Sequence, residues 1–120
     1  CLAGLGDLWE DEVSYSRALK GVDAKMPRLV LSHNPDTSLE EQAKHYRVDA
    51  MFSGHTHGGQ VSVPLVGPPK LPSMYGKRFA GGICEGSGFP VVVSRGVGMA
   101  FLPVRFRVPP ELVLVRLKQA

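Results

Sequence analysis

Three histidines in this sequence have neighbours and a spacing that suit metal coordination. His55 and His57 are separated by one residue within the glycine-flanked segment 54–59, and His33 follows an apolar run. Residues two apart on a strand share a face, and glycines let a turn aim both rings into one small volume. Neutral imidazole binds first-row metals such as zinc, manganese and iron. We therefore interpret these histidines as candidate metal ligands.

The same pattern allows other interpretations. A His-x-His pair by itself is more typical of two surface histidines than of a metal site, and a purely structural role without metal is a further alternative. The position of the three residues favours ligands, because they are expected at the ends of two adjacent strands. The remaining histidine, His45, lies in a predicted helix with charged neighbours and is expected to be exposed.

Short apolar runs and turn residues predict an α/β fold for the first half of the chain. A strand, a helix and a second strand in this order favour a parallel sheet, with functional loops at the carboxyl ends of its strands. Strands are expected over 1–5, where Gly6 and Asp7 close the strand, over 28–32 and over 48–53. A first helix is expected over 11–20, with Val13 and Leu19 facing inward. A second helix is expected from a Thr37 or Ser38 cap to Tyr46, with Glu40 and Glu41 in its first turn.

The second half of the chain reads as mostly β structure with glycine and proline at the turns. Strands are expected at 60–64, 79–84, 90–94 and 111–117, with a proline-rich loop at 68–77 and a turn at 85–88. No internal repeat, low-complexity segment or linker divides the sequence. Residues 1–120 are therefore taken as a single domain.

Composition places the chain among small globular domains. The 120 residues are 43% hydrophobic and 21% charged, with a net charge of +3 spread along the chain. Nucleic-acid binding is not indicated, because it usually needs clustered basic residues. The two cysteines give no disulfide framework, and we find no membrane-spanning stretch or signal peptide. Because the chain begins with cysteine, we expect a piece of a longer protein. We expect that protein to be either cytoplasmic or membrane-peripheral.

Several motifs together resemble the calcineurin-like metallophosphoesterases. They are Gly-His-Thr-His-Gly-Gly-Gln at 54–60, Leu-Ser-His-Asn-Pro-Asp at 31–36, Ser-Arg-Gly-Val-Gly at 94–98, Pro-Val-Arg at 103–105 and Pro-Pro-Glu-Leu at 109–112. The last three are similar to the tail of a bacterial subgroup that includes phosphodiesterases acting on lipid-linked sugar nucleotides. The resemblance implies the C-terminal half of an αββα sandwich, with a mixed sheet and a β-rich second half.

The resemblance also implies a role for each histidine. The family histidines that match His33 and His55 bind the second metal, and the one that matches His57 binds the first, so His55 and His57 are catalytic as well as metal-binding candidates. The family's other ligands come from Asp-x-His, Gly-Asp-x-x-Asp and Gly-Asn-His motifs, and none of these is present here. Asp7 does not replace them, because position 10 is glutamate and no Gly-Asn-His follows.

The missing carboxylates have a physical consequence. Two cations about 3.5–4 Å apart can activate a water and stabilise the oxygens of a phosphoryl displacement. Three neutral histidines bring no negative charge to hold two cations close together. We therefore expect two divalent ions (Mn, Zn or Fe) in the complete domain, but one or none in this chain alone, with little hydrolysis.

Other side chains are weaker candidates. Arg95 and Arg105 can pair bidentately with a substrate phosphate or with carboxylates, although ordinary surface arginines are the common alternative. Asp36 can orient His33 as a hydrogen-bond acceptor, or it can simply shape the turn after Pro35. Gln60 is expected to line the pocket, and the apolar segment 99–102 is expected either to touch a lipidic substrate or to pack in the core.

Two classes of function follow from these observations. In the first, the parent protein is a metal-dependent phosphomonoesterase or phosphodiesterase, and its phosphoester substrate can be lipid-linked. In the second, the chain is a non-catalytic module that binds a metal, a phosphate or a protein on the same fold. A short chain with exposed sheet edges can also pair with another copy, so we expect homo-oligomers.

Overall fold

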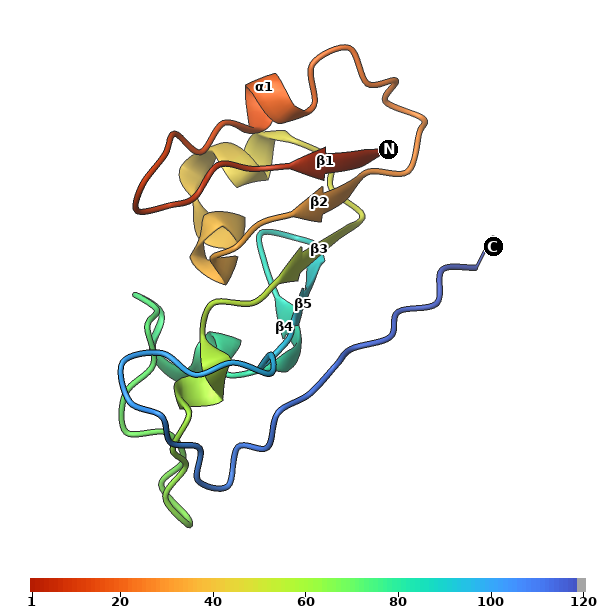
Figure 1. The fold of residues 1–120 in the computed structure, drawn as a ribbon. Helices are drawn as coiled ribbons and strands as arrows, with labels where there is room; N and C mark the ends of the chain where they lie inside the picture. Colours follow the sequence, from red (N-terminus) through yellow and green to blue (C-terminus); the bar gives the residue numbers. More distant parts are fainter. Residues whose placement is uncertain (119–120) are drawn as a thin grey trace.

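The computed structural model describes residues 1–118, and within them one mixed β-sheet forms the framework (Figure 1). Its strands lie in the order β1-β2-β3-β5-β4, where β1, β2, β3 and β5 run parallel and β4 runs antiparallel to β5. The expected α/β fold with a mixed sheet is confirmed at this level. The strands are β1 (Leu2–Gly4), β2 (Leu29–Leu31), β3 (Ala50–Ser53), β4 (Gly82–Glu85) and β5 (Pro90–Val93).

The first helix is much shorter than the predicted span of 11–20. Helix α1 covers only Tyr15–Ala18, and the Ser14 hydroxyl caps it by accepting the N–H of Arg17. Residues 11–14 form a bend and irregular backbone instead, and the carboxylate of Asp11 accepts the N–H of Glu12. Such local side-chain bonds compete with helix formation.

The helix predicted from Thr37 or Ser38 to Tyr46 is also wrong. The structure has two short 3-10 helices here, η1 (Pro35–Leu39) and η2 (Glu41–His45). Asn34 provides the first cap by accepting the N–H of Asp36, and the hydroxyls of Thr37 and Ser38 donate back to main-chain carbonyls. Glu40 separates the two helices with an extended backbone, at ψ 144°. His45 is exposed, as predicted.

One face of the sheet is covered by other segments of the chain. Val30, Met51 and Val91 are in register across three strands and are fully buried. Tyr15 from α1 and Phe79 belong to the same core. The predicted inward positions are confirmed, because Leu19 is buried and Val13 is partly buried against this core. The apolar face of the sheet therefore holds α1 and the 3-10 helices in place.

The opposite face of the sheet has a second apolar row that is much less covered. Leu31, Phe52, Val92 and Ile83 are aligned across β2, β3, β5 and β4. Leu31 is 45% exposed and Ile83 is 79% exposed. A row of large apolar side chains on a sheet face normally packs against another layer. Within residues 1–118 no such layer is present.

The second half of the chain has less β structure than predicted. Residues 60–64 contribute only two isolated bridges, Val61 with Phe106 and Val63 with Gly67. Strand β4 starts at Gly82, because Phe79 lies in a 3-10 helix, η4 (Gly76–Phe79). A further 3-10 turn, η3 (His57–Gly59), lies within the histidine segment. The predicted strand over 90–94 is confirmed as β5.

The predicted final strand at 111–117 is wrong for the part of the chain described. These residues form an extended tail beside the sheet without a ladder partner (Figure 1), and Leu112, Leu114 and Leu117 are exposed. The alternation of side chains is present, but no neighbouring strand is available to receive the backbone bonds. Between residues 1 and 118, no helix has both the length and the apolar character that crossing a membrane requires.

Candidate functional site

The three candidate histidines line one pocket beyond the carboxyl ends of the strands. The pocket has a volume of about 530 Å³, and Trp9, Gln60 and Lys70 also line it. His33 follows β2 and His55 follows β3, and the N–H of Gly54 donates to the carbonyl of His33 at 3.2 Å. Parallel pairing of β2 with β3 thus brings together two residues that are far apart in the sequence.

The backbone of the histidine segment adopts an unfavourable conformation. His55 and His57 have φ angles of 63° and 49°, in the left-handed region that side chains other than glycine rarely adopt. Each such residue costs of order 1–3 kcal/mol, and such strain clusters at functional sites. The following Gly58 has no alternative, because an added Cβ would lie 2.8 Å from Cγ1 of Val108. The turn therefore depends on close packing around it.

His33 and His55 are in direct contact. Nε2 of His33 and Nδ1 of His55 are 3.1 Å apart, and one nitrogen donates to the other. Burial lowers the pKa of His55, and the neighbouring His33 lowers this pKa further. The ring is consequently neutral near pH 7, which is the form that ligates metals. Trp9 packs edge-on against it, with the ring centroids 4.5 Å apart.

The donor atoms fit a metal in chemical type. Nε2 of His55 is buried and has no hydrogen-bond partner in the described residues, and an unpaired imidazole nitrogen suits a first-row metal. The set is incomplete, however. Nowhere in residues 1–118 is a group of three or more His, Cys, Asp and Glu side chains arranged to hold a metal ion. Nδ1 of His57 lies 3.2 Å from the carbonyl of Gly98.

Asp7 forms the predicted turn and also acts on the site. The N–H of Trp9 lowers the pKa of the Asp7 carboxyl, and the charges of His33 and His55 add to this effect. The turn thus places a carboxylate and the Trp9 ring beside the histidine pair. Sequence patterns gave no sign of this, because the segment 6–10 matches no ligand motif.

The Asp36 side chain forms hydrogen bonds with residues of the proline-rich loop 68–77. Its buried carboxylate accepts the Ser73 hydroxyl at 2.6 Å and the N–H of Met74 at 2.7 Å. No hydrogen bond between Asp36 and His33 occurs in the part of the chain that the structure describes. Asp36 therefore fixes the loop that carries Lys70 and Pro72 into the pocket.

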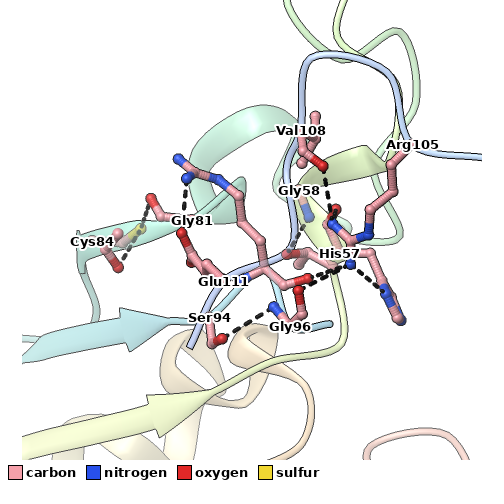
Figure 2. A network of polar contacts seen from close by, with 12 residues as sticks. His57, Gly58, Gly81, Cys84, Ser94, Gly96, Arg105, Val108 and Glu111 are labelled. Atoms are coloured by element: carbon pink, nitrogen blue, oxygen red, sulfur yellow. Dashed lines mark hydrogen bonds and ion pairs between the residues drawn. The ribbon is translucent and has the colours of Figure 1, made fainter. Parts of the chain in front are cut away.

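The two candidate arginines have protein partners, and neither lines the pocket of the described residues. Nη1 of Arg95 donates to the carboxylate of Glu111 at 2.9 Å, and the N–H of Arg95 donates to the same group. Of the two partners predicted for Arg95, a phosphate or a carboxylate, the structure shows the carboxylate. Arg105 donates to main-chain carbonyls around the histidine turn (Figure 2).

Gln60 lines the pocket, as predicted. Its side-chain amide donates to the carbonyls of Ala100 and Leu102, at 3.0 and 3.4 Å, and its side-chain oxygen accepts the N–H of Ala100. The apolar segment 99–102 is therefore held at the pocket, and Phe101 is fully exposed there. Sequence reasoning missed Trp9 and Lys70, which belong to no motif, although Trp9 is the single tryptophan of the chain.

Comparison with known proteins connects this site to one class of enzyme. The chain is 36% identical to the metallophosphoesterase YkuE of Bacillus subtilis over 117 residues, and 39% identical to the phosphodiesterase YaeI of Escherichia coli over 116 residues. These matches span 98% and 97% of this chain. It is also 33% identical over 125 residues to the UDP-2,3-diacylglucosamine pyrophosphatase LpxG of Chlamydia muridarum.

The match covers only part of each relative. The chain spans 40% of the length of YkuE and of YaeI, and 36% of the length of LpxG. No family model and no solved structure matches the chain. The chain therefore corresponds to part of the length of these bacterial metallophosphoesterases and phosphodiesterases.

Proposed function

Since this chain is homologous over nearly its whole length to part of bacterial metallophosphoesterases, we propose that it is one portion of the catalytic domain of such a hydrolase. The observation that supports this most directly is the convergence of His33, His55 and His57 on one pocket. The reaction is the hydrolysis of a phosphomonoester or a phosphodiester.

His33, His55 and His57 hold the metal ions in this proposal. When bound, two divalent cations (Mn, Zn or Fe) activate a water and stabilise the charge that develops on the phosphoryl oxygens. His55 is suited to this role because its ring is neutral and its Nε2 has no partner in the described residues. The acidic ligands come from the portion of the domain outside this chain. For that reason we expect this chain alone to bind one metal ion or none.

The uncovered sheet face supports a larger domain. Leu31, Phe52, Val92 and Ile83 form an apolar row on this face. Leu31 and Ile83 are exposed, and Phe52 and Val92 line an open pocket with residues of the segment 111–115. The relatives are about two and a half times as long as this chain. We propose that the remaining portion packs a second sheet on this face, which completes an αββα sandwich.

The pocket lining suggests how the substrate is bound. Lys70 can contact a phosphate as a point charge, and Trp9 and Phe101 offer exposed apolar surface beside the histidines. A phosphoester with a lipid-linked group fits such a lining, and LpxG is by its name an enzyme for UDP-2,3-diacylglucosamine. In this proposal Arg95 and Arg105 support the pocket and do not bind the phosphate.

The test is hydrolysis of an aryl phosphodiester by the full-length protein with added Mn²⁺, compared between the wild type, His55→Ala and His45→Ala. Loss of groups that only orient metal ligands costs about 10–100-fold, so loss of a ligand is expected to reduce the rate at least about 100-fold. His45→Ala is the matched control, because His45 is exposed and lies outside the pocket. Equal rates for all three proteins would refute the proposal.

The competing function is a non-catalytic module on the same fold. The incomplete ligand set within residues 1–118 is the observation that favours it. In that case the full-length wild type binds Mn²⁺ or phosphate without hydrolysing the diester, and His55→Ala changes binding alone.

A further inference from the structure

Arg105 is the centre of a hydrogen-bond network around the histidine turn (Figure 2). Its guanidinium is half-buried and donates to five main-chain carbonyls at 2.6–3.4 Å. The described residues show no carboxylate paired with it. The five carbonyls belong to His57, Arg95, Gly96, Gly98 and Val108.

One of these carbonyls is shared with His57. Nε and Nη2 of Arg105 donate to the oxygen of Gly98 at 3.0 and 2.6 Å, and Nδ1 of His57 lies 3.2 Å from the same oxygen. A carbonyl oxygen only accepts hydrogen bonds. The contact is therefore a bond only if Nδ1 of His57 carries a proton, and in the neutral ring Nε2 then keeps a free lone pair.

The reverse arrangement is weaker. Nη2 of Arg105 is 3.5 Å from Nδ1 of His57, at the limit of a hydrogen bond, and the same Nη2 is 2.6 Å from Gly98. Donation from Arg105 to an unprotonated Nδ1 would lose the shorter contact of His57 with Gly98. The geometry thus favours a single tautomer of the ring.

We propose that Arg105 is a positioning residue: it holds the Gly98 carbonyl so that His57 keeps its proton on Nδ1 and offers Nε2 to a metal ion. This inference rests on the proposed function only for the identity of what Nε2 binds. In this proposal Arg105 positions His57, whereas the sequence made Arg105 a candidate ligand of the substrate phosphate. A ligating histidine usually gives its other N–H to such an acceptor, which fixes the tautomer and the ring orientation.

Lysine cannot take over this role. The guanidinium has five N–H groups in a rigid plane, and here they reach carbonyls on three separate stretches of chain, at 57, 95–98 and 108. The ammonium of lysine has three donors on a flexible stem and cannot hold all three stretches together. Arg105→Lys is therefore expected to resemble Arg105→Met.

The experiment reads the tautomer directly, in the full-length protein labelled with ¹⁵N-histidine. Long-range ¹H–¹⁵N spectra of the metal-free protein separate the two tautomers, and His57→Gln identifies the signals of His57. We expect the Nδ1–H tautomer in the wild type. A mixture of the two tautomers is expected in Arg105→Lys and Arg105→Met. Arg107→Met is the control, because Arg107 is an exposed arginine two residues away.

Binding of Mn²⁺ alone, followed by titration calorimetry, gives the second measurement. Loss of such an orienting partner weakens metal affinity about 10–100-fold, so this range is expected for both Arg105 variants and no change is expected for Arg107→Met. An Nε2–H tautomer in the wild type overturns the proposal without any variant. So does an Arg105 variant that keeps both the tautomer and the affinity.

Loss of folding does not remove the test. If Arg105→Met fails to fold, Arg105→Lys and the wild-type tautomer still decide the proposal. The outcomes also separate this inference from the proposed function. A wild type with the expected tautomer and Mn²⁺ affinity but without hydrolysis refutes the hydrolase and leaves the role of Arg105 intact.

Discussion

The sheet and the loops around the pocket are held together in different ways. The strands are joined by backbone ladders and by buried apolar side chains such as Val30, Met51 and Val91. The pocket loops, which we define as residues 54–60, 68–77 and 95–108, are fixed mainly by single polar side chains that bind distant main-chain groups. The sheet thus shares its stability among many contacts, whereas each pocket loop is tied to the rest of the molecule by a few polar side chains.

The largest expected effect in this comparison comes from the sheet. Met51→Ala removes a fully buried side chain at the middle of the core, and such changes cost about 2–5 kcal/mol. Chemical denaturation of the full-length protein is expected to show this loss. Hydrogen exchange is expected to rise across the whole sheet at once, because the strands share the core.

Leu31→Ala serves as the partner of this experiment, because Leu31 lies on the opposite face of the sheet. If the remaining portion of the domain covers that face, its truncation in the full-length protein costs about 2–5 kcal/mol as well. A loss below about 0.5 kcal/mol, typical of exposed positions, would contradict the proposed sandwich.

The sheet could be predicted from the sequence because its signals are local. Residues 28–32 and 90–94 are compact apolar runs that contain β-branched residues and are bounded by turn residues, and both form strands close to the expected bounds. The helices were harder, because Asp11 and Asn34 use their side chains to bind nearby N–H groups, and such local bonds compete with a regular α-helix. The strand expected at 111–117 failed for lack of a neighbouring strand.

The pocket was only partly predictable, for a related reason. His33, His55 and His57 are recognisable because glycines and strand ends surround them, and the structure places all three in one pocket. Trp9 and Lys70 reach the same pocket through loops whose course is set by contacts between distant residues. The periodicity of the sequence does not predict such long-range contacts, and it does not predict which carbonyls Arg105 binds.

A smaller effect is expected from the proline-rich loop. Asp36→Ala leaves the N–H of Met74 and the hydroxyl of Ser73 without their partner, and the loss of such a buried acceptor costs about 1–3 kcal/mol. Unlike Met51→Ala, this change is expected to raise hydrogen exchange chiefly in residues 68–77. Exchange measured by mass spectrometry distinguishes the two patterns.

Asp49→Ala is the control for Asp36→Ala, because Asp49 also accepts a main-chain N–H, that of Arg28, but lies at the surface. That N–H is the main cause of the lowered pKa of Asp49. Its contribution is therefore present above the unfolded-state pKa of about 3.9 and is lost as the pH falls through the lower folded value. At neutral pH we expect Asp49→Ala to cost less than about 1 kcal/mol. An equal loss for both variants would mean that the burial of Asp36 does not increase the contribution of its hydrogen bonds to the free energy of unfolding.

The smallest effect gives the sharpest comparison, because a glutamine side chain performs the same task in the layer that packs on the sheet and in the pocket loops. Gln42 holds the start of α1, donating to the carbonyl of Val13 and accepting the N–H of Tyr15, and Gln60 holds Ala100 in the same two-bond manner. Each Gln→Ala change is expected to cost about 0.5–1.5 kcal/mol. Only Gln60→Ala is expected to raise exchange at 99–102 and to weaken Mn²⁺ binding, since the Gly98 carbonyl lies beside that segment. If Gln42→Ala weakens Mn²⁺ binding equally, the pocket depends on overall stability, and the division between sheet and pocket loops fails.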